Sequence, residues 1–148
     1  MKNKIPPPIL TLLCIYFIYA MDELSPNFTF TYQDIFAYLI GVEALLIIFF
    51  AIKEFKKAGT TLSPMKINEA SSLVTSGIFK FSRNPMYLGL TSLQIAAGFY
   101  FGNWFVVLII PMFIFYITFY QIIPEEKVSK EKFGDDFKIY CSKVGRWL

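Results

Sequence analysis

Long apolar runs separated by short polar connections dominate the chain. Four runs stand out, at about residues 5–21, 35–52, 85–101 and 104–123. A transmembrane helix needs about 20 consecutive apolar residues, with about 17 as a lower limit. The last run meets this length comfortably, and the other three reach both boundaries if interfacial Tyr, Trp and Lys anchor them. The pattern predicts an all-α integral membrane protein with four transmembrane helices.

Composition agrees with lipid as the solvent and leaves room for one domain. The chain has 148 residues, which we interpret as a single membrane domain over 1–148. Hydrophobic residues make up 55% of it, with 17 Phe and 9 Tyr. This content exceeds that of an ordinary soluble domain. We interpret the first run as a retained helix rather than a signal peptide, because no convincing small-residue cleavage site follows it.

The placement of charge predicts the topology. All 14 Lys and Arg residues fall in the N-terminal segment, in the connection 53–84 or in the tail 124–148, and the connections 22–34 and 102–103 have none. Four spans put the three basic segments on one side, which the positive-inside rule makes cytoplasmic. We therefore expect both termini in the cytoplasm of a bacterium or archaeon, with the spans in its inner membrane. The net charge of +3 reflects this topology, so nucleic-acid binding is not expected. The same basic face can attract anionic lipid headgroups.

A polar cluster, residues 82–89, opens the third apolar run. Asn84 and Pro85 are typical of a helix start, since Asn can cap and Pro is favoured at the first helical position. Backbone N–H groups at such a start attract anions. Arg83 can bind a carboxylate or phosphate at two points, and the ring of Tyr87 can hold a cation or a flat ring. A snorkelling Arg and an interfacial Tyr would explain the same residues without a binding site.

A second cluster, Pro124-Glu125-Glu126, closes the fourth run. If the runs 85–101 and 104–123 form a membrane hairpin, both clusters lie side by side on one face. Glu125 and Glu126 can complement a helix dipole, or they can bind an ammonium group or ribose hydroxyls. Opposite Arg83 they form a site with both signs of charge, which suits a zwitterionic ligand. The pairing of the two clusters favours a functional site over a purely structural role.

The segments beside this site have patterns of their own. In the connection 53–84, residues 73–79 are too short and polar to span, so we expect them to pack against the membrane face as a lid or floor. Pro124 predicts the start of a cytoplasmic helix through about Phe133, with Gly134 as its stop. A short amphipathic helix that covers the site is predicted next, from the stripe Phe137, Tyr140, Cys141 and Val144. Cys14 lies in the first span, so no disulfide with Cys141 is expected.

These motifs together resemble the C-terminal half of the isoprenylcysteine carboxyl methyltransferase and phospholipid methyltransferase superfamily. The resemblance covers about residues 60–148 and depends on the order of the pieces. The pieces are Leu73-Val74-Thr75, Gly77-Ile78-Phe79, Arg83-Asn84-Pro85-Met86-Tyr87-Leu88-Gly89, Glu125-Glu126, Phe133-Gly134, Tyr140, Val144 and Arg146-Trp147. The resemblance implies a membrane-embedded methyltransferase that uses S-adenosyl-L-methionine.

The resemblance also implies which residues form the site. Carried over by position, the catalytic residues are Arg83 and Glu126. The cofactor-binding residues are Asn84, Pro85, Tyr87, Gly89, Glu125 and Glu126. No metal is implied. A lipid or lipidated acceptor would enter sideways from the bilayer, and the cofactor from the cytoplasm.

One departure from the family pattern affects the acceptor. The family usually has His where this chain has Asn84, and the chain contains no His. Asn can donate a hydrogen bond but cannot shuttle protons near neutral pH. A carboxylate acceptor, such as that of isoprenylcysteine, is already ionised and needs no general base. A lipid amine or a small thiol is the alternative, and an amine would have to give its proton to a glutamate or water.

Glu43 lies in the middle of the second run, where an acid usually faces protein or water. It can hydrogen-bond within the bundle, orient an acceptor or serve a proton path. A small transporter that uses Glu43 is a rival interpretation, although the chain has no internal repeat. A non-catalytic membrane module of the same fold is another, and Asn84 is the argument for it. The sequence does not predict an oligomeric state.

Overall fold

The structure is a computed structural model that describes residues 5–24, 26–59 and 72–148. Over these ranges the chain is helical and contains no strand. The elements are α1 (Pro7–Ala20), α2 (Gln33–Lys57), the short 3₁₀ helix η2 (Gly77–Lys80), α3 (Pro85–Phe101), α4 (Val106–Ile117), the π-helical turn η3 (Thr118–Ile122) and α5 (Ile123–Lys143). A helix therefore covers each of the four predicted apolar runs.

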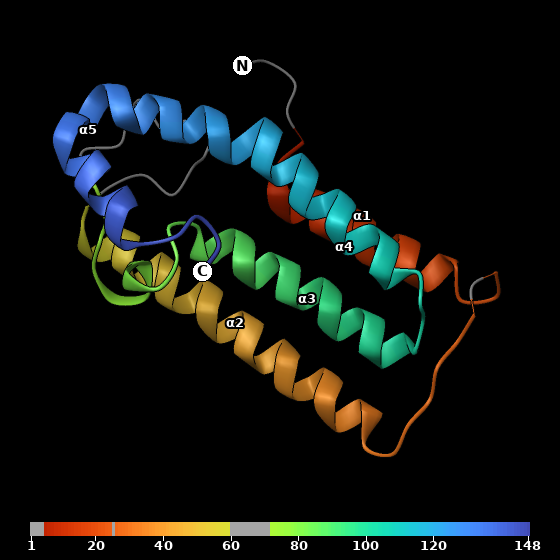
Figure 1. The fold of residues 1–148 in the computed structure, drawn as a ribbon. Coiled ribbons are helices and arrows are strands. Elements are labelled where there is room, and N and C mark those ends of the chain that lie inside the picture. The colour runs from red at the N-terminus through yellow and green to blue at the C-terminus, as the bar shows by residue number, and fades with distance from the viewer. Residues whose placement is uncertain (1–4, 25, 60–71) are drawn as a thin grey trace.

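Helix α3 lies at the centre of the bundle. It contacts α1, α2 and α4, and it contributes many of the buried residues (Figure 1). Its glycines permit close approach of the neighbours. A Cβ on Gly89 would lie 2.6 Å from the side chain of Ile48 and 3.0 Å from the carbonyl oxygen of Ala44, both on α2. The close approach of α2 to α3 therefore depends on the absence of a side chain at Gly89.

The helix that covers the fourth apolar run continues beyond Pro124. Helix α4, η3 and α5 form one continuous helix from Val106 to Lys143 (Figure 1). Pro124 lacks the N–H that would bond one turn back, and the wider π turn directly before it accommodates this loss. Pro124 lies in the first turn of α5, as predicted, but α5 continues the preceding helix instead of starting a separate one.

The predicted stop at Gly134 is confirmed as a sharp bend. Gly134 has φ 53° and ψ −120°, a conformation that is essentially restricted to glycine. The chain resumes as a helix beyond it and folds back toward the start of α3 (Figure 1). Phe137 and Tyr140 are buried there, so the predicted apolar stripe faces the protein.

Two helices of the described ranges are long and apolar enough to cross a membrane, namely α2 and the continuous helix Val106–Lys143. Helices α1 and α3 have 14 and 17 residues, so four membrane crossings stay a prediction. Exposed apolar side chains cover the outer faces of α1, α2 and α4. This arrangement fits a lipid environment, because a water-soluble monomer rarely exposes so much apolar surface.

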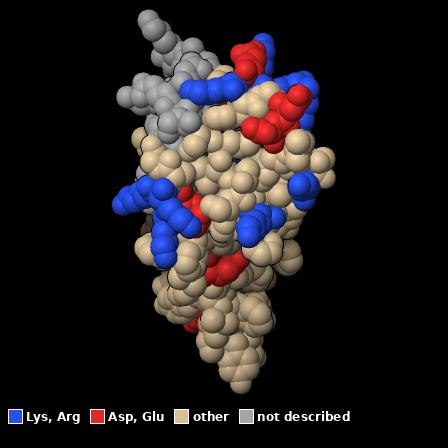
Figure 2. All heavy atoms as spheres, turned by 90° about the vertical axis from the view of Figure 1, so that its left-hand side faces the viewer, with Lys and Arg blue, Asp and Glu red and all other residues tan. Residues whose placement is uncertain are grey.

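Basic side chains gather at one end of the molecule. Figure 2 views the end where α2 finishes and α5 bends, and Lys and Arg side chains are distributed over it. Lys53, Lys56 and Lys57 come from the end of α2, and several more come from α5. The Lys residues at the end of α2 and those on α5 therefore share one end, as the topology argument expects.

Candidate active site

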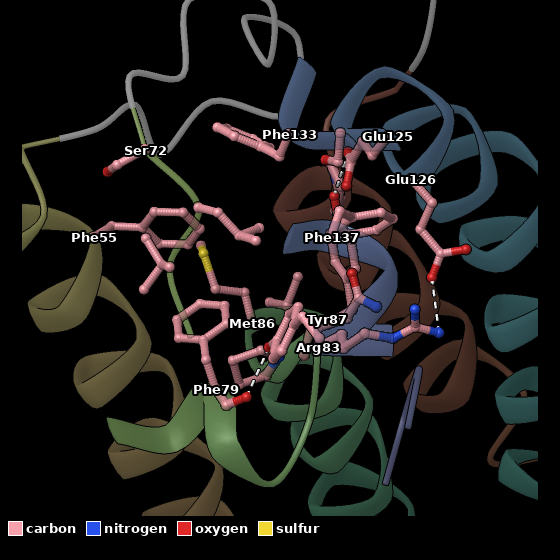
Figure 3. Close-up of a pocket in the computed structure, with 18 of the residues that line it drawn as sticks. Phe55, Ser72, Phe79, Arg83, Met86, Tyr87, Glu125, Glu126, Phe133 and Phe137 are labelled. Atoms are coloured by element: carbon pink, nitrogen blue, oxygen red, sulfur yellow. Dashed lines mark hydrogen bonds and ion pairs between the residues drawn. The ribbon is translucent and has the colours of Figure 1, made fainter. Parts of the chain in front are cut away.

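A cavity of about 280 Å³ lies at this basic end. The start of α1, the end of α2, residues 72–87 and α5 all contribute walls. Figure 3 shows Phe55, Phe79 and Met86 on one side of it, with Arg83, Glu125 and Glu126 on the other. The lining residues are Pro7, Pro8, Phe55, Ser72, Leu73, Val74, Phe79, Arg83, Asn84, Pro85, Met86, Tyr87, Leu90, Glu125, Glu126, Ser129, Phe133, Phe137 and Tyr140.

The charged side of the cavity centres on Glu126, which bonds to two arginines. Arg83 Nη2 lies 3.1 Å from Glu126 Oε1 (Figure 3), and Arg146 donates from Nε at 3.1 Å and from Nη2 at 2.7 Å. The hydrogen bond to Glu126 raises the pKa of Arg146. Two guanidinium groups therefore share one carboxylate, which leaves a net positive charge available to an anionic ligand.

Arg83 is the most enclosed of these charged groups. Its side chain is 13% exposed, and its Nη1 donates to the Sγ of Cys141. Its Nε is buried and has no hydrogen-bond partner among the described residues. A buried donor without a partner costs about 1–3 kcal/mol, so this atom is a natural contact for a ligand oxygen.

Glu125 belongs to a separate hydrogen-bond group beside this cluster. The hydroxyl of Tyr87 donates to Glu125 Oε1 at 2.8 Å, and Gln121 Nε2 donates to the same oxygen at 2.6 Å. The π turn η3 contains Gln121, and π turns are frequent at functional sites. Gln121 was not among the residues that we predicted for the site. Its spacing of four residues from Glu125, one helical turn, is the sequence signal that places it beside the site.

Residues 144–148, which we call the closing segment, run back over the charged side. The N–H of Arg83 donates to the carbonyl of Gly145 at 3.1 Å, and Asn84 Nδ2 donates to the carbonyl of Arg146 at 2.9 Å. Trp147 Nε1 donates to Thr118 Oγ1 at 3.2 Å. The closing segment thus joins α3, η3 and α5 at the cavity.

Asn84 precedes α3 as predicted, but its side chain does not cap the helix. The amide serves the closing segment instead, while the Asn84 N–H donates to Ser82 Oγ at 3.0 Å. The cap prediction was wrong in this respect: a cap would use Asn84 Oδ1 as the acceptor, whereas the side chain is held through Nδ2, which donates to the carbonyl of Arg146.

The apolar side of the cavity is aromatic. The rings of Phe55 and Phe79 meet edge to face with centroids 5.1 Å apart. The hydroxyl of Tyr140 donates to the carbonyl of Phe79 at 2.7 Å, and burial raises the pKa of Tyr140, with Arg83 acting in the opposite direction. The segment 73–79 forms a wall of the cavity rather than a span, and its packing against the membrane face stays a prediction. Phe55 was not predicted for the site, and Met86 lies within the predicted cluster 82–89 but was given no role there.

Most residues predicted for the site lie together. Those that line the cavity are Arg83, Asn84, Pro85, Tyr87, Glu125 and Glu126. Gly89 does not line it, since it is buried in the contact with α2. Its place in the motif reflects helix packing rather than ligand contact.

Glu43 lies outside this group. It is exposed on α2, and it forms no hydrogen bond or ion pair with any described residue. The hydrogen bond within the bundle that we considered is therefore not made by that part of the chain. Cys14 and Cys141 are both free thiols, as expected.

Over the described residues, the fold and the cavity define a helical protein of the membrane with a ligand-sized, charged site at its basic end. Residues 32–136, more than half of the chain, match the sequence profile of the phospholipid methyltransferase family, and the chain belongs to this family. The resemblance drawn from the motifs is thereby confirmed. An uncharacterized protein of Haemophilus influenzae is 40% identical over 63 residues, which are 43% of this chain and all of that protein. No solved structure matches.

Proposed function

We propose that the protein transfers a methyl group from S-adenosyl-L-methionine to a membrane-associated acceptor at this cavity. The observation that supports this most directly is the pair Arg83–Glu126 beside Glu125 in an aromatic-walled pocket. Because the chain belongs to a methyltransferase family, we interpret this arrangement as a binding site for a methyl donor. We propose further that the basic end and the cavity face the cytoplasm, where the cofactor is available.

The residues fit the zwitterionic end of the cofactor. Arg83 offers a buried Nε without a partner among the described residues, which suits the carboxylate of the methionyl group. Glu125 suits its ammonium group, because both Tyr87 and Gln121 hold the Glu125 carboxylate in place. When bound, the cofactor supplies a methyl group on a sulfonium, which is already activated for displacement.

The aromatic side fits the other end of the same molecule. The rings of Phe55 and Phe79, with Phe133 and Phe137, offer flat apolar surfaces for a purine. They also exclude water from the cavity, which strengthens every charged contact inside it. The chain's contribution to the reaction is then positioning and desolvation. Holding two reactants in line can contribute on the order of 7–11 kcal/mol.

We propose a carboxylate, such as that of isoprenylcysteine, as the acceptor. A carboxylate arrives ionised, and the chain has no His to act as a base near neutral pH. The description of the matched family favours a second candidate, a phospholipid amine. That acceptor would have to lose a proton, for which Glu125 and Glu126 are the nearest carboxylates.

The chemistry of the product separates the candidates. Purified protein in liposomes that contain an isoprenylcysteine analogue or an aminophospholipid is supplied with methyl-labelled cofactor. A methyl ester releases labelled methanol in mild alkali, whereas an N-methyl or S-methyl product keeps its label. We expect alkali-labile label that disappears in Arg83→Ala and persists in Glu131→Gln, an exposed carboxylate on the same helix as Glu126. No label in any lipid fraction from folded protein would contradict the proposal.

A further inference from the structure

One buried hydroxyl group in the cavity has no role in the function proposed above. Ser129 lines the cavity from α5, and the residue is 9% exposed. Its hydroxyl forms no hydrogen bond with any other residue that the structure describes. Buried polar groups in folded proteins nearly always have a hydrogen-bond partner. The Ser129 hydroxyl is therefore available to a ligand that enters the cavity.

Ser129 differs in this respect from the other neutral polar side chains that line the cavity. Within the described ranges, each of the others donates a hydrogen bond to a backbone carbonyl or to a carboxylate. These residues are Ser72, Asn84, Tyr87 and Tyr140. Their donors serve to hold the walls of the cavity together, whereas the donor of Ser129 is unused.

The position of Ser129 on α5 indicates which part of a ligand it meets. Glu125, Ser129 and Phe133 all line the cavity, and they follow one another at intervals of four residues in the part of α5 that precedes Gly134. Residues four apart lie on the same side of an α-helix, about 6 Å from each other along its axis. Glu125 and Phe133 both come from the α5 side of the cavity (Figure 3). This wall therefore carries a carboxylate, a hydroxyl and an aromatic ring in that order.

The proposed methyl donor has complementary groups in the same order. The proposed function pairs its ammonium group with Glu125 and its purine with aromatic rings that include Phe133. The ribose joins the sulfonium to the purine, so a donor extended along α5 has its ribose beside Ser129. The ribose carries two adjacent hydroxyls, at C2′ and C3′. Each can donate and accept a hydrogen bond, as the serine hydroxyl can.

We propose that the hydroxyl of Ser129 binds the ribose hydroxyls of the S-adenosyl ligand. This inference rests on the proposed function and adds a residue that distinguishes a ribosyl ligand from its deoxyribosyl analogue. Ser129 contacts the ribose rather than the reacting atoms, so its contribution is to affinity. The contact also fixes the direction in which the ligand lies, with its amino-acid end toward Glu125 and its purine toward Phe133.

A cycle of protein and ligand changes tests this contact. Detergent-purified wild type and Ser129→Ala are titrated calorimetrically with S-adenosylhomocysteine and with its 2′-deoxy and 3′-deoxy analogues. We expect Ser129→Ala to weaken the binding of S-adenosylhomocysteine by about fivefold. It should bind at least one deoxy analogue as the wild type does, because removing both partners of one contact is not additive. The control is Ser142→Ala, which removes an exposed hydroxyl of α5 that donates to the carbonyl of Ile139, and it should bind all three ligands like the wild type.

The outcomes separate this inference from the proposed function. Equal affinity of S-adenosylhomocysteine for Ser129→Ala and for the wild type would overturn the inference and leave the methyltransferase assignment intact. An equal loss for all three ligands would overturn it as well, since such a loss is not specific to the ribose. Absence of binding to folded wild-type protein would overturn both.

A cysteine at position 129 provides a second measurement that does not depend on the folding of Ser129→Ala. Ser129→Cys is treated with a small methanethiosulfonate reagent, and peptide mass spectrometry reads the labelling at that position, so both native cysteines can stay. S-adenosylhomocysteine at about ten times its Kd should slow this labelling about tenfold by mass action. The labelling of Ser142→Cys, on the exposed side of α5, should not change. Equal labelling rates at position 129 with and without the ligand would overturn the proposed contact.

Discussion

Arg146 holds the carboxylate of Glu126 with two hydrogen bonds, from Nε to Oε1 at 3.1 Å and from Nη2 to Oε2 at 2.7 Å. The two residues are 20 positions apart, and the bend at Gly134 brings them together. The same carboxylate also bonds to Arg83. The closing segment therefore fixes the orientation of the charged side of the cavity.

Replacing Arg146 should leave the Glu126 carboxylate less firmly oriented while its contact with Arg83 remains. We expect Arg146→Ala to weaken cofactor binding by about tenfold or more, since a hydrogen bond to a charged group contributes roughly 1.5–3 kcal/mol. Arg146→Lys should recover only part of this, because an ammonium group cannot make the two-point contact. Calorimetric titration measures both variants. Lys143→Ala, an exposed cation at the end of α5, is the control, and an Arg146→Ala affinity equal to it would argue against the role.

Tyr87 should affect cofactor binding through its hydroxyl group and not through its ring. Tyr87→Phe keeps the ring and removes the donor to Glu125 Oε1. Gln121 then remains as the other donor, so we expect correctly folded protein with affinity for the cofactor lowered by about tenfold. Tyr116→Phe is the matched control, because the Tyr116 ring stacks on Tyr120 away from the cavity. A similar result for both variants would mean that Glu125 needs no support from Tyr87.

Gly89 should affect stability rather than ligand contact. A side chain there meets Ile48 and the carbonyl of Ala44, so Gly89→Val should lower the free energy of unfolding by about 1–3 kcal/mol. The test is thermal unfolding in detergent. Gly41→Ala is the control, since its new Cβ would lie 3.8 Å from the Cβ of Ala96, an ordinary contact. If Gly89→Val unfolds like the wild type but loses the cofactor, the residue acts in the site after all.

Gly134 should be needed for the bend in α5. A side chain at its φ of 53° and ψ of −120° is strained, and Gly134→Ala should cost on the order of 1–3 kcal/mol. The strain favours a straight helix, which would move Phe137 and Tyr140 off the cavity. Limited proteolysis of the segment beyond residue 134 should therefore become faster. Asp135→Ala, the exposed neighbour, should behave like the wild type, and an unchanged cleavage rate in Gly134→Ala would contradict this account.

The positions of the helices, and many of the residues that line the cavity, could be predicted from the sequence. Apolar runs located the helices, and the paired clusters predicted that Arg83 and Glu126 face each other, which the 3.1 Å contact confirms. Gly134 was identified as a stop because few other residues permit its conformation. These predictions succeeded because each depends on local chemistry or on one hairpin.

The features that could not be predicted from the sequence depend on contacts between distant segments. The bond between Asn84 and the closing segment, and the pairing of Arg146 with Glu126, arise only once the tail has folded back. The π turn before Pro124 keeps a helix intact where local rules predicted a new start. The exposure of Glu43 depends on which face of α2 packs against α3, and an almost uniformly apolar helix does not reveal that face.

The most direct test of the central claim is calorimetric titration of the detergent-purified protein with S-adenosyl-L-methionine and with S-adenosylhomocysteine. We predict micromolar binding of both ligands that is lost in Arg83→Ala and in Glu125→Ala and retained in Glu131→Ala. Circular dichroism confirms that every variant is folded. Absence of binding to folded wild-type protein, or unchanged affinity in Glu125→Ala, would contradict the assignment of this cavity as the methyl-donor site.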